Sequence, residues 1–195
     1  MRRFSFSLIL PLLSLLVLLP ALPSCTPKDP FAYAQTAFSV SVRGTYTPAG
    51  SDTPRPFAAA VTVGAPLGGD PVVRDLTVAF TEPAPLAGLT VTARVVPSPD
   101  GAPERTVTLL YPSDYGTIQS TAAGGEFNGF LRFAEALLPP GDVAEISPIA
   151  PDGSYTVIRR ADGREAVFVF TEEGTLPLRV TVTTPAEVLT LTVTP

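Results

Sequence analysis

Apolar residues alternate with small or polar ones along most of the chain from Phe38 onward. In the segment 76–81, Leu76, Val78 and Phe80 are separated by threonine and alanine. A period of two puts every second side chain on the same side of an extended strand, so the pattern predicts half-buried antiparallel strands. The predicted strands are 38–43, 57–63, 76–81, 89–95, 106–111, 143–147, 154–160, 165–171, 178–183 and 188–194.

Clusters of proline, glycine and aspartate separate these strands. They occur, for example, at 48–52, 68–71 and 97–101, and Asp162-Gly163 lies between two of the predicted strands. Proline fixes φ and glycine permits positive φ, so such clusters favour tight turns, and Asp-Gly is a strong hairpin signal. Short strands joined in this way predict an antiparallel meander.

The segment 127–138 has helical spacing instead. Its apolar residues recur three or four positions apart, and Pro139-Pro140-Gly141 ends the pattern. We predict one amphipathic helix here, with Arg132 and Glu135 on its solvated side. A single helix must bury its apolar stripe on a sheet. The expected fold is therefore mainly β (α+β): a strongly curved antiparallel sheet, or incomplete β-barrel, with this helix packed on its concave face.

The first 25 residues differ from the rest of the chain. Two arginines at positions 2 and 3 precede an apolar run from Leu8 to Leu19, and the run leads to Cys25, the only cysteine. This order is typical of a secretory signal, and the segment 22–25 resembles a bacterial lipobox. We expect cleavage after residue 24 and a diacylglyceryl group on Cys25. The alternatives are an ordinary signal peptide that leaves a free thiol, or an uncleaved membrane anchor.

These features predict a location and a division of the chain. The protein would be extracytoplasmic and lipid-anchored to a bacterial cell membrane, on the outer leaflet of the cytoplasmic membrane or on the outer membrane. Residues 1–24 would be the signal peptide, 25–36 a lipidated tether and 37–195 one β domain. Asp29-Pro30 could open a short helical turn that ends near Gln35.

Composition narrows the possible functions. Removing residues 1–24, which hold two arginines and no acid, takes the formal net charge from −5 to −7, which argues against nucleic acid or anionic lipid surfaces as partners. The chain has no histidine and Lys28 is its only lysine, so histidine-based catalysis and most metal sites have no ligands or base. We predict that the protein is not an enzyme and holds no metal or cofactor.

The segment 161–182, ADGREAVFVFTEEGTLPLRVTV, combines an acidic turn with a Gly-x-Leu-Pro-Leu entry into the next strand. It resembles the LolA/LolB-type lipoprotein carriers. That resemblance implies an incomplete barrel whose concave face is covered by helices, and the lipidated Cys25 parallels the LolB branch. The segment 87–91, AGLTV, resembles small lipoproteins of Gram-positive bacteria that have no assigned activity.

The favoured function is the binding of a lipid or other hydrophobic ligand between sheet and helix. Phe127, Phe130, Phe133 and Leu137 are the candidate lining of such a groove. The alternative for these four residues is that they only fill the core under the helix, as apolar helical stripes usually do.

Two other functions remain open. An envelope interaction or structural lipoprotein, with a protein or cell-wall partner, could use the loops 48–56 and 97–103 or the tyrosines at 111 and 115, although these are also ordinary turn sequences. A hydrolase with two carboxylates is the third possibility. Its candidates are Asp114, Glu126, Asp142 and Glu145, and nothing in their spacing indicates the separation that such catalysis needs.

Overall fold

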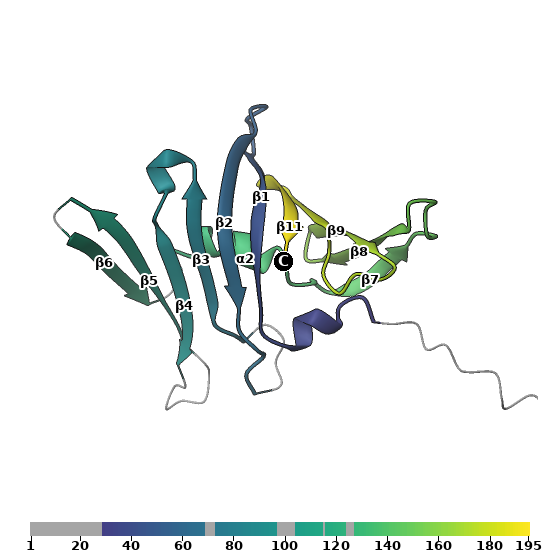
Figure 1. Cartoon of the computed structure of the whole chain (residues 1–195), viewed down its shortest axis with the longest axis horizontal. Coiled ribbons are helices and arrows are strands. Elements are labelled where there is room, and N and C mark those ends of the chain that lie inside the picture. The colour runs from purple at the N-terminus through teal and green to yellow at the C-terminus, as the bar shows by residue number, and fades with distance from the viewer. Residues whose placement is uncertain (1–28, 69–72, 97–103, 115, 124–126) are drawn as a thin grey trace, which may run out of the picture.

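The computed structural model describes residues 29–68, 73–96, 104–114, 116–123 and 127–195 (Figure 1). Cys25, the predicted signal peptide, the loop 97–103, Tyr115 and Glu126 lie outside the described residues. The strands are β1 (Phe38–Pro48), β2 (Arg55–Val63), β3 (Leu76–Glu82), β4 (Thr90–Val96), β5 (Glu104–Ser113), β6 (Gly116–Ala123), β7 (Asp142–Ile146), β8 (Ser154–Ala161), β9 (Arg164–Thr171), β10 (Arg179–Thr184) and β11 (Glu187–Thr194). The described helices are the 3-10 helices η3 (Ala32–Gln35) and η4 (Ala84–Leu86) and the α-helix α2 (Asn128–Glu135).

All eleven strands form one antiparallel sheet. Its order is β6-β5-β4-β3-β2-β1-β11-β10-β9-β8-β7, so two meanders meet where β1 pairs with β11 (Figure 1). The edge strands β6 and β7 have no described pairing with each other, and the sheet is not closed into a barrel. The prediction of a mainly β, antiparallel fold with one helix is confirmed for the described part of the chain.

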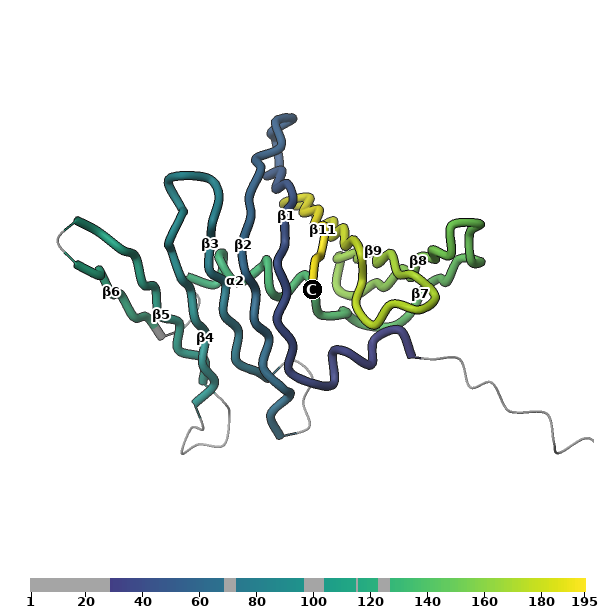
Figure 2. The backbone as a smooth tube through the Cα atoms, in the orientation of Figure 1, coloured from purple at the N-terminus to yellow at the C-terminus, as the bar shows by residue number. Residues whose placement is uncertain are grey.

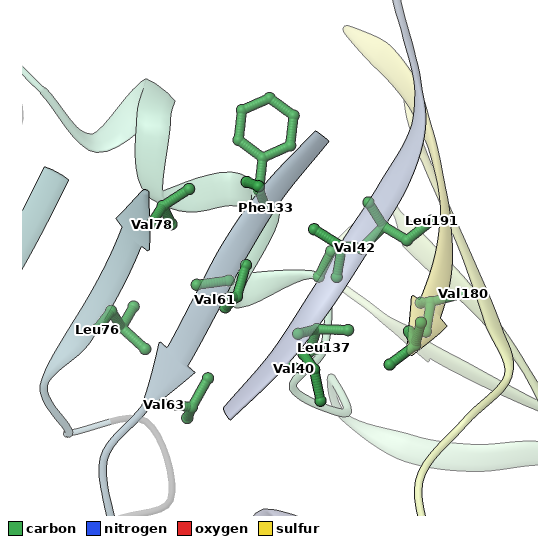
Figure 3. Packing of buried hydrophobic residues seen from close by; sticks show 14 of the residues in the cluster. Val40, Val42, Val61, Val63, Leu76, Val78, Phe133, Leu137, Val180 and Leu191 are labelled. Atoms are coloured by element: carbon green, nitrogen blue, oxygen red, sulfur yellow. The ribbon is translucent and has the colours of Figure 1, made fainter. Parts of the chain in front are cut away.

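The alternating pattern places one face of each central strand in the core. Val61 of β2 pairs with Val40 of β1 and with Val78 of β3, and all three side chains are buried. Figure 3 shows them beside Phe133 and Leu137 from the helical segment. Because side chains alternate with a period of two, this register carries the apolar set of every central strand to the same face.

β6 is the strand that the sequence pattern does not predict. Its residues from 116 to 121 are exposed, and Ile118 is 59% exposed. Burial of one face of a strand favours alternation of apolar and polar side chains. β6 is held by its backbone ladder to β5 at the edge of the sheet, so its sequence carries no such signal.

The helix α2 lies inside the predicted range and is shorter. It covers eight residues, and single hydrogen-bonded turns continue it to Leu138. It packs on β2, β3 and β4 through the buried side chains of Leu131, Phe133 and Ala134. In the described part of the chain, no helix has both the length and the apolar character that crossing a membrane requires.

The expectation that Arg132 and Glu135 face solvent is wrong. Arg132 forms an ion pair with Glu187 at the start of β11, and a carboxylate oxygen of Glu135 lies 2.8 Å from Nη1 of Arg105 on β5. All four side chains are half-buried. The polar side of the helix therefore also faces strands, which a helical pattern taken alone does not reveal.

The contacts of Glu135 show that the sheet is bent. Besides its bond to Arg105 of β5, its backbone carbonyl accepts a hydrogen bond of 3.0 Å from Nη2 of Arg164, at the start of β9. Six strands lie between β5 and β9 in the sheet. In a flat sheet β5 and β9 would lie about 34 Å apart, at roughly 4.8 Å per strand. Two arginine side chains together could not span that distance. Figure 2 shows β8 and β9 running across the direction of β1 and β2.

The segment before β1 is part of the packed domain. Phe31, Tyr33 and Ala34 are buried, and the ring of Phe31 lies 5.0 Å from that of Phe168. A side-chain oxygen of Asp29 accepts a hydrogen bond of 2.9 Å from the backbone nitrogen of Phe31. The expectation that Asp29 is the N-cap is wrong, because η3 begins at Ala32 and its N-cap is Phe31. Phe31, Tyr33 and Ala34, which lie in the segment expected to be a tether, therefore belong to the core.

Candidate functional site

Two of the four candidate groove residues are enclosed. The ring of Phe133 lies 4.3 Å from that of Phe57 and 5.3 Å from that of Phe80, and its side chain is buried. Leu137 is also buried, and its carbonyl oxygen accepts a hydrogen bond of 2.6 Å from the hydroxyl of Tyr33. Phe133 and Leu137 therefore pack in the core.

The other two candidates, Phe127 and Phe130, are half-buried and pack against the margin of the core. Beside them, along the N-terminal half of α2, lies a groove of about 370 Å³. Phe130 and Phe133 line this groove, whereas Phe127 and Leu137 do not. The lining is mostly apolar and consists of Tyr46, Arg55, Pro56, Phe57, Pro83, Leu86, Gly129, Phe130, Arg132 and Phe133.

The strand register explains why these side chains meet. Tyr46 of β1 pairs with Arg55 of β2, so both lie at the same end of the sheet. Phe57 follows Arg55 by two residues and is buried on the core face, so the pleat turns Arg55 toward that face as well. Leu86 comes from η4, in the connection between β3 and β4, and closes the groove from the neighbouring strand pair.

Two arginines line the groove, and only one of them has an ion pair among the described residues. Arg132 is paired with Glu187, and its guanidinium carbon lies 4.8 Å from the centre of the Tyr46 ring. Arg55 is exposed and has no ion pair among the described residues. The groove therefore combines apolar walls with one positive charge at its rim that is not neutralised by a described carboxylate.

Sequence reasoning missed most of the lining. Tyr46, Pro83 and Leu86 come from a strand end and a connection, where no periodic pattern selects them. Arg55 could have been found, because it precedes an inward-facing phenylalanine by two positions in a strand. We expected the side chain of Arg132 to face solvent, because a helical stripe does not show which strands approach the polar side of the helix.

The candidate catalytic carboxylates are not brought together. Asp114 is exposed in the turn between β5 and β6, whereas Asp142 and Glu145 are exposed on β7, at the opposite end of the strand order. The fourth, Glu126, lies outside the described residues. In the ranges that the structure describes, no group of three or more acidic or cysteine side chains could hold a metal ion.

Comparison with known proteins gives little further information. No protein-family model matches the sequence, and no curated protein matches it. Among solved structures, the chain is similar to the crystal structure of a DUF1329 family protein from Desulfovibrio piger ATCC 29098, with 12% sequence identity and a TM-score of 0.39. The match covers 82% of this chain and 84% of that chain. At this TM-score the likeness supports no statement about function or about the LolA/LolB resemblance.

Proposed function

We propose that this protein is a non-enzymatic lipoprotein that binds an acyl chain or a similar hydrophobic ligand in the groove beside α2. In this proposal the bent sheet is an incomplete barrel of the LolA/LolB kind, with α2 on its concave face. The bonds from Glu135 to both β5 and β9 support this arrangement, because strands from both halves of the sheet reach the same end of the helix.

The groove is the observation that carries the proposal. Its volume of about 370 Å³ lies in the range of roughly 300–1,000 Å³ that is usual for small-molecule sites. Phe57, Phe130 and Phe133 supply apolar walls, and Arg55 stands exposed at the rim. This combination suits an amphiphile whose chain lies on the rings and whose anionic end is near the guanidinium.

Membrane attachment in this proposal is through Cys25. Its support is the signal-like sequence before it and the lipobox-like segment 22–25. Lipidation would hold the protein outside the cytoplasm, with the domain beginning close to the membrane, because Phe31 already packs in the core. A groove close to the bilayer is well placed to receive a lipid from it.

Native mass spectrometry tests both parts of the proposal at once. The full chain is expressed in bacteria, extracted in a mild detergent and weighed under native and then denaturing conditions. We expect a non-covalent added mass that disappears on denaturation, and a covalent diacylglyceryl mass on a chain that starts at Cys25. The C25S variant should keep residues 1–24 and lack the covalent mass.

The non-covalent mass tests ligand binding and the covalent mass tests the anchor, so each part of the proposal can be contradicted separately. A native mass equal to the polypeptide with its covalent lipid, unchanged after incubation with phospholipid and fatty acid, would contradict ligand binding and leave the anchor intact. A denatured mass that shows no lipid on Cys25 would contradict the anchor alone.

A second function is favoured by a different surface. Val143 and Ile146 on the edge strand β7, and Ile149 after it, are 46%, 58% and 54% exposed. Exposed apolar side chains beside an unpaired strand edge are typical of interaction sites. An envelope interaction protein would lose its partner in the I146S and I149S variants, whereas binding of a lipid in the groove would not change.

A further inference from the structure

The strand β6 leaves one backbone edge without a partner strand. Within the described part of the chain it pairs only with β5, along its whole length of eight residues. In an antiparallel ladder, every second residue directs its N–H and C=O to one neighbouring strand, and the residues between them direct theirs to the other side. Half of the backbone groups of β6 therefore point away from the sheet, and such a row is a template for another strand.

Side-chain packing gives β6 little other support. Positions 116–121 are exposed on both faces of the sheet, and Ile118 is 59% exposed. The helix α2 packs on β2, β3 and β4 instead, and Figure 1 shows β6 at the outer end of the sheet, beyond β5. Strands that bury little apolar surface are only marginally stable in water, so a second ladder on the free edge would stabilise β6.

The sequence of β6 has none of the features that usually protect an edge. Natural edge strands carry charged side chains, proline or a β-bulge, each of which hinders pairing with another chain. The segment 116–123, GTIQSTAA, has no charged residue and no proline. Its pairs with β5 follow one another without a shift of register. The edge is therefore open to a strand of equal length.

The opposite edge strand, β7, does have these features. It has only five residues, and Asp142 and Glu145 carry negative charge. Its register with β8 shifts between Val143 and Glu145. A backbone ladder on β7 would be short and interrupted, although its exposed side chains can still contact a partner. Of the two edges that a second copy of the chain offers, β6 is therefore the better match for β6.

We propose that β6 pairs with β6 of a second copy of this chain, antiparallel and about a two-fold axis, so that the two sheets continue into each other. Two eight-residue strands joined in this way form about eight backbone hydrogen bonds, which is within the roughly 10 ± 5 of a typical interface. Because β6 has no charged residue, no register places like charges of the two strands opposite each other. The same edge is used by both copies, so the contact closes at two.

Apolar side chains add to the ladder on one face. Ile118 lies opposite Tyr111 of β5, and the even-numbered positions of β6 share the face on which Val107 is buried. The exposed isoleucines of the two copies would approach each other across the axis on that face. The contact does not depend on the proposed ligand, because no residue of β5 or β6 lines the groove.

Sedimentation velocity over a series of protein concentrations tests the proposal. The full chain in a mild detergent is compared with its Q119K and Q119E variants. In a ladder centred on the middle of β6, the two copies of Gln119 lie opposite each other or one diagonal step apart, within reach of long side chains. We expect a monomer–dimer equilibrium for the wild type. Each variant should dimerise at least about tenfold more weakly, because like charges that face each other across an interface are strongly unfavourable.

Two further samples separate edge pairing from general damage to the fold. An equimolar mixture of Q119K and Q119E places opposite charges across the axis and should dimerise as the wild type does, a gain that misfolding cannot produce. The T183K variant is the matched control, because Thr183 is also exposed but lies on β10, which is paired with β9 and with β11. It should dimerise like the wild type.

Three results would overturn the proposal. The first is a wild type that is monomeric at every concentration, which would leave the edge to a strand of another protein. The second is dimerisation of Q119K and Q119E as strong as that of the wild type, because chains that only share a detergent micelle do not respond to residue 119. The third is a mixture of the two variants that dimerises no better than either variant alone.

Discussion

Phe133 joins the helix to the sheet more closely than any other aromatic residue of α2. It is buried between Phe57 and Phe80, so truncation would leave a cavity between helix and sheet. We expect the F133A variant to lose about 3–5 kcal/mol of unfolding free energy, the usual cost for a buried phenylalanine. Urea unfolding measures this, with F127A as a control that should lose less, because Phe127 is half-buried.

Tyr33 makes the stability of the protein depend on pH in the alkaline range. Its hydroxyl is buried and donates to the carbonyl oxygen of Leu137 at 2.6 Å. Burial raises the pKa of this phenol far above its ordinary value of 10.0, although Arg159 and Arg74 act in the opposite direction. In the unfolded chain the phenol ionises near pH 10, whereas in the folded chain it must stay protonated.

The stability that Tyr33 provides is therefore fully present below pH 10 and is lost as the pH rises above that value. The slope from this one group approaches about 1.4 kcal/mol per pH unit. Unfolding between pH 9 and 11.5 should show a steeper fall for the wild type than for Y33F, which has no phenol at this position. Equal slopes would show that Tyr33 is not buried as described.

Among the strands, the β1–β11 pair has a special role, because it joins the two meanders into one sheet. Gly44 of β1 lies opposite Leu191 of β11, and an added Cβ would overlap the backbone oxygen of Thr190. Backbone cannot move aside as a side chain can, so G44A should cost about 3 kcal/mol or more.

The G64A variant is the control for this prediction. At Gly64, just after β2, the nearest atom to an added Cβ is the backbone oxygen of Asp75, at 3.2 Å, so the overlap is much smaller than at Gly44. Thermal unfolding of both variants checks the difference. A G44A variant as stable as G64A would mean that the two meanders are not held together as closely as described.

Most strands could be predicted because each has one buried face and therefore a period of two. β6 could not, since Ile118 and its neighbours are exposed and carry no pattern. The helix could be predicted from its apolar stripe, but the pairing of Arg132 with Glu187 could not, because it joins residues 55 positions apart in sequence. The same holds for the groove, of whose lining only Phe130 and Phe133 were candidates.

In the molecule as a whole, the bend of the sheet determines where the candidate site lies. Bending brings Arg105 and Arg164 to the same glutamate, and the groove lies along the same helix, from Gly129 to Phe133. Local sequence patterns specify which side chains face inward but do not specify the bend, which depends on contacts between distant strands. For this reason the candidate site was only partly predictable.

The central claim is that the groove beside α2 binds an acyl chain. Titration of the full chain with a fluorescent fatty acid, cis-parinaric acid, tests it most directly in the wild type, F130A and F127A. Both phenylalanines are half-buried on the same helical segment, and only Phe130 lines the groove. We predict saturable binding to the wild type and to F127A, and about tenfold weaker binding to F130A, as loss of roughly 1.4 kcal/mol of apolar contact implies. No binding to the wild type, or equal binding to the two variants, would contradict the claim.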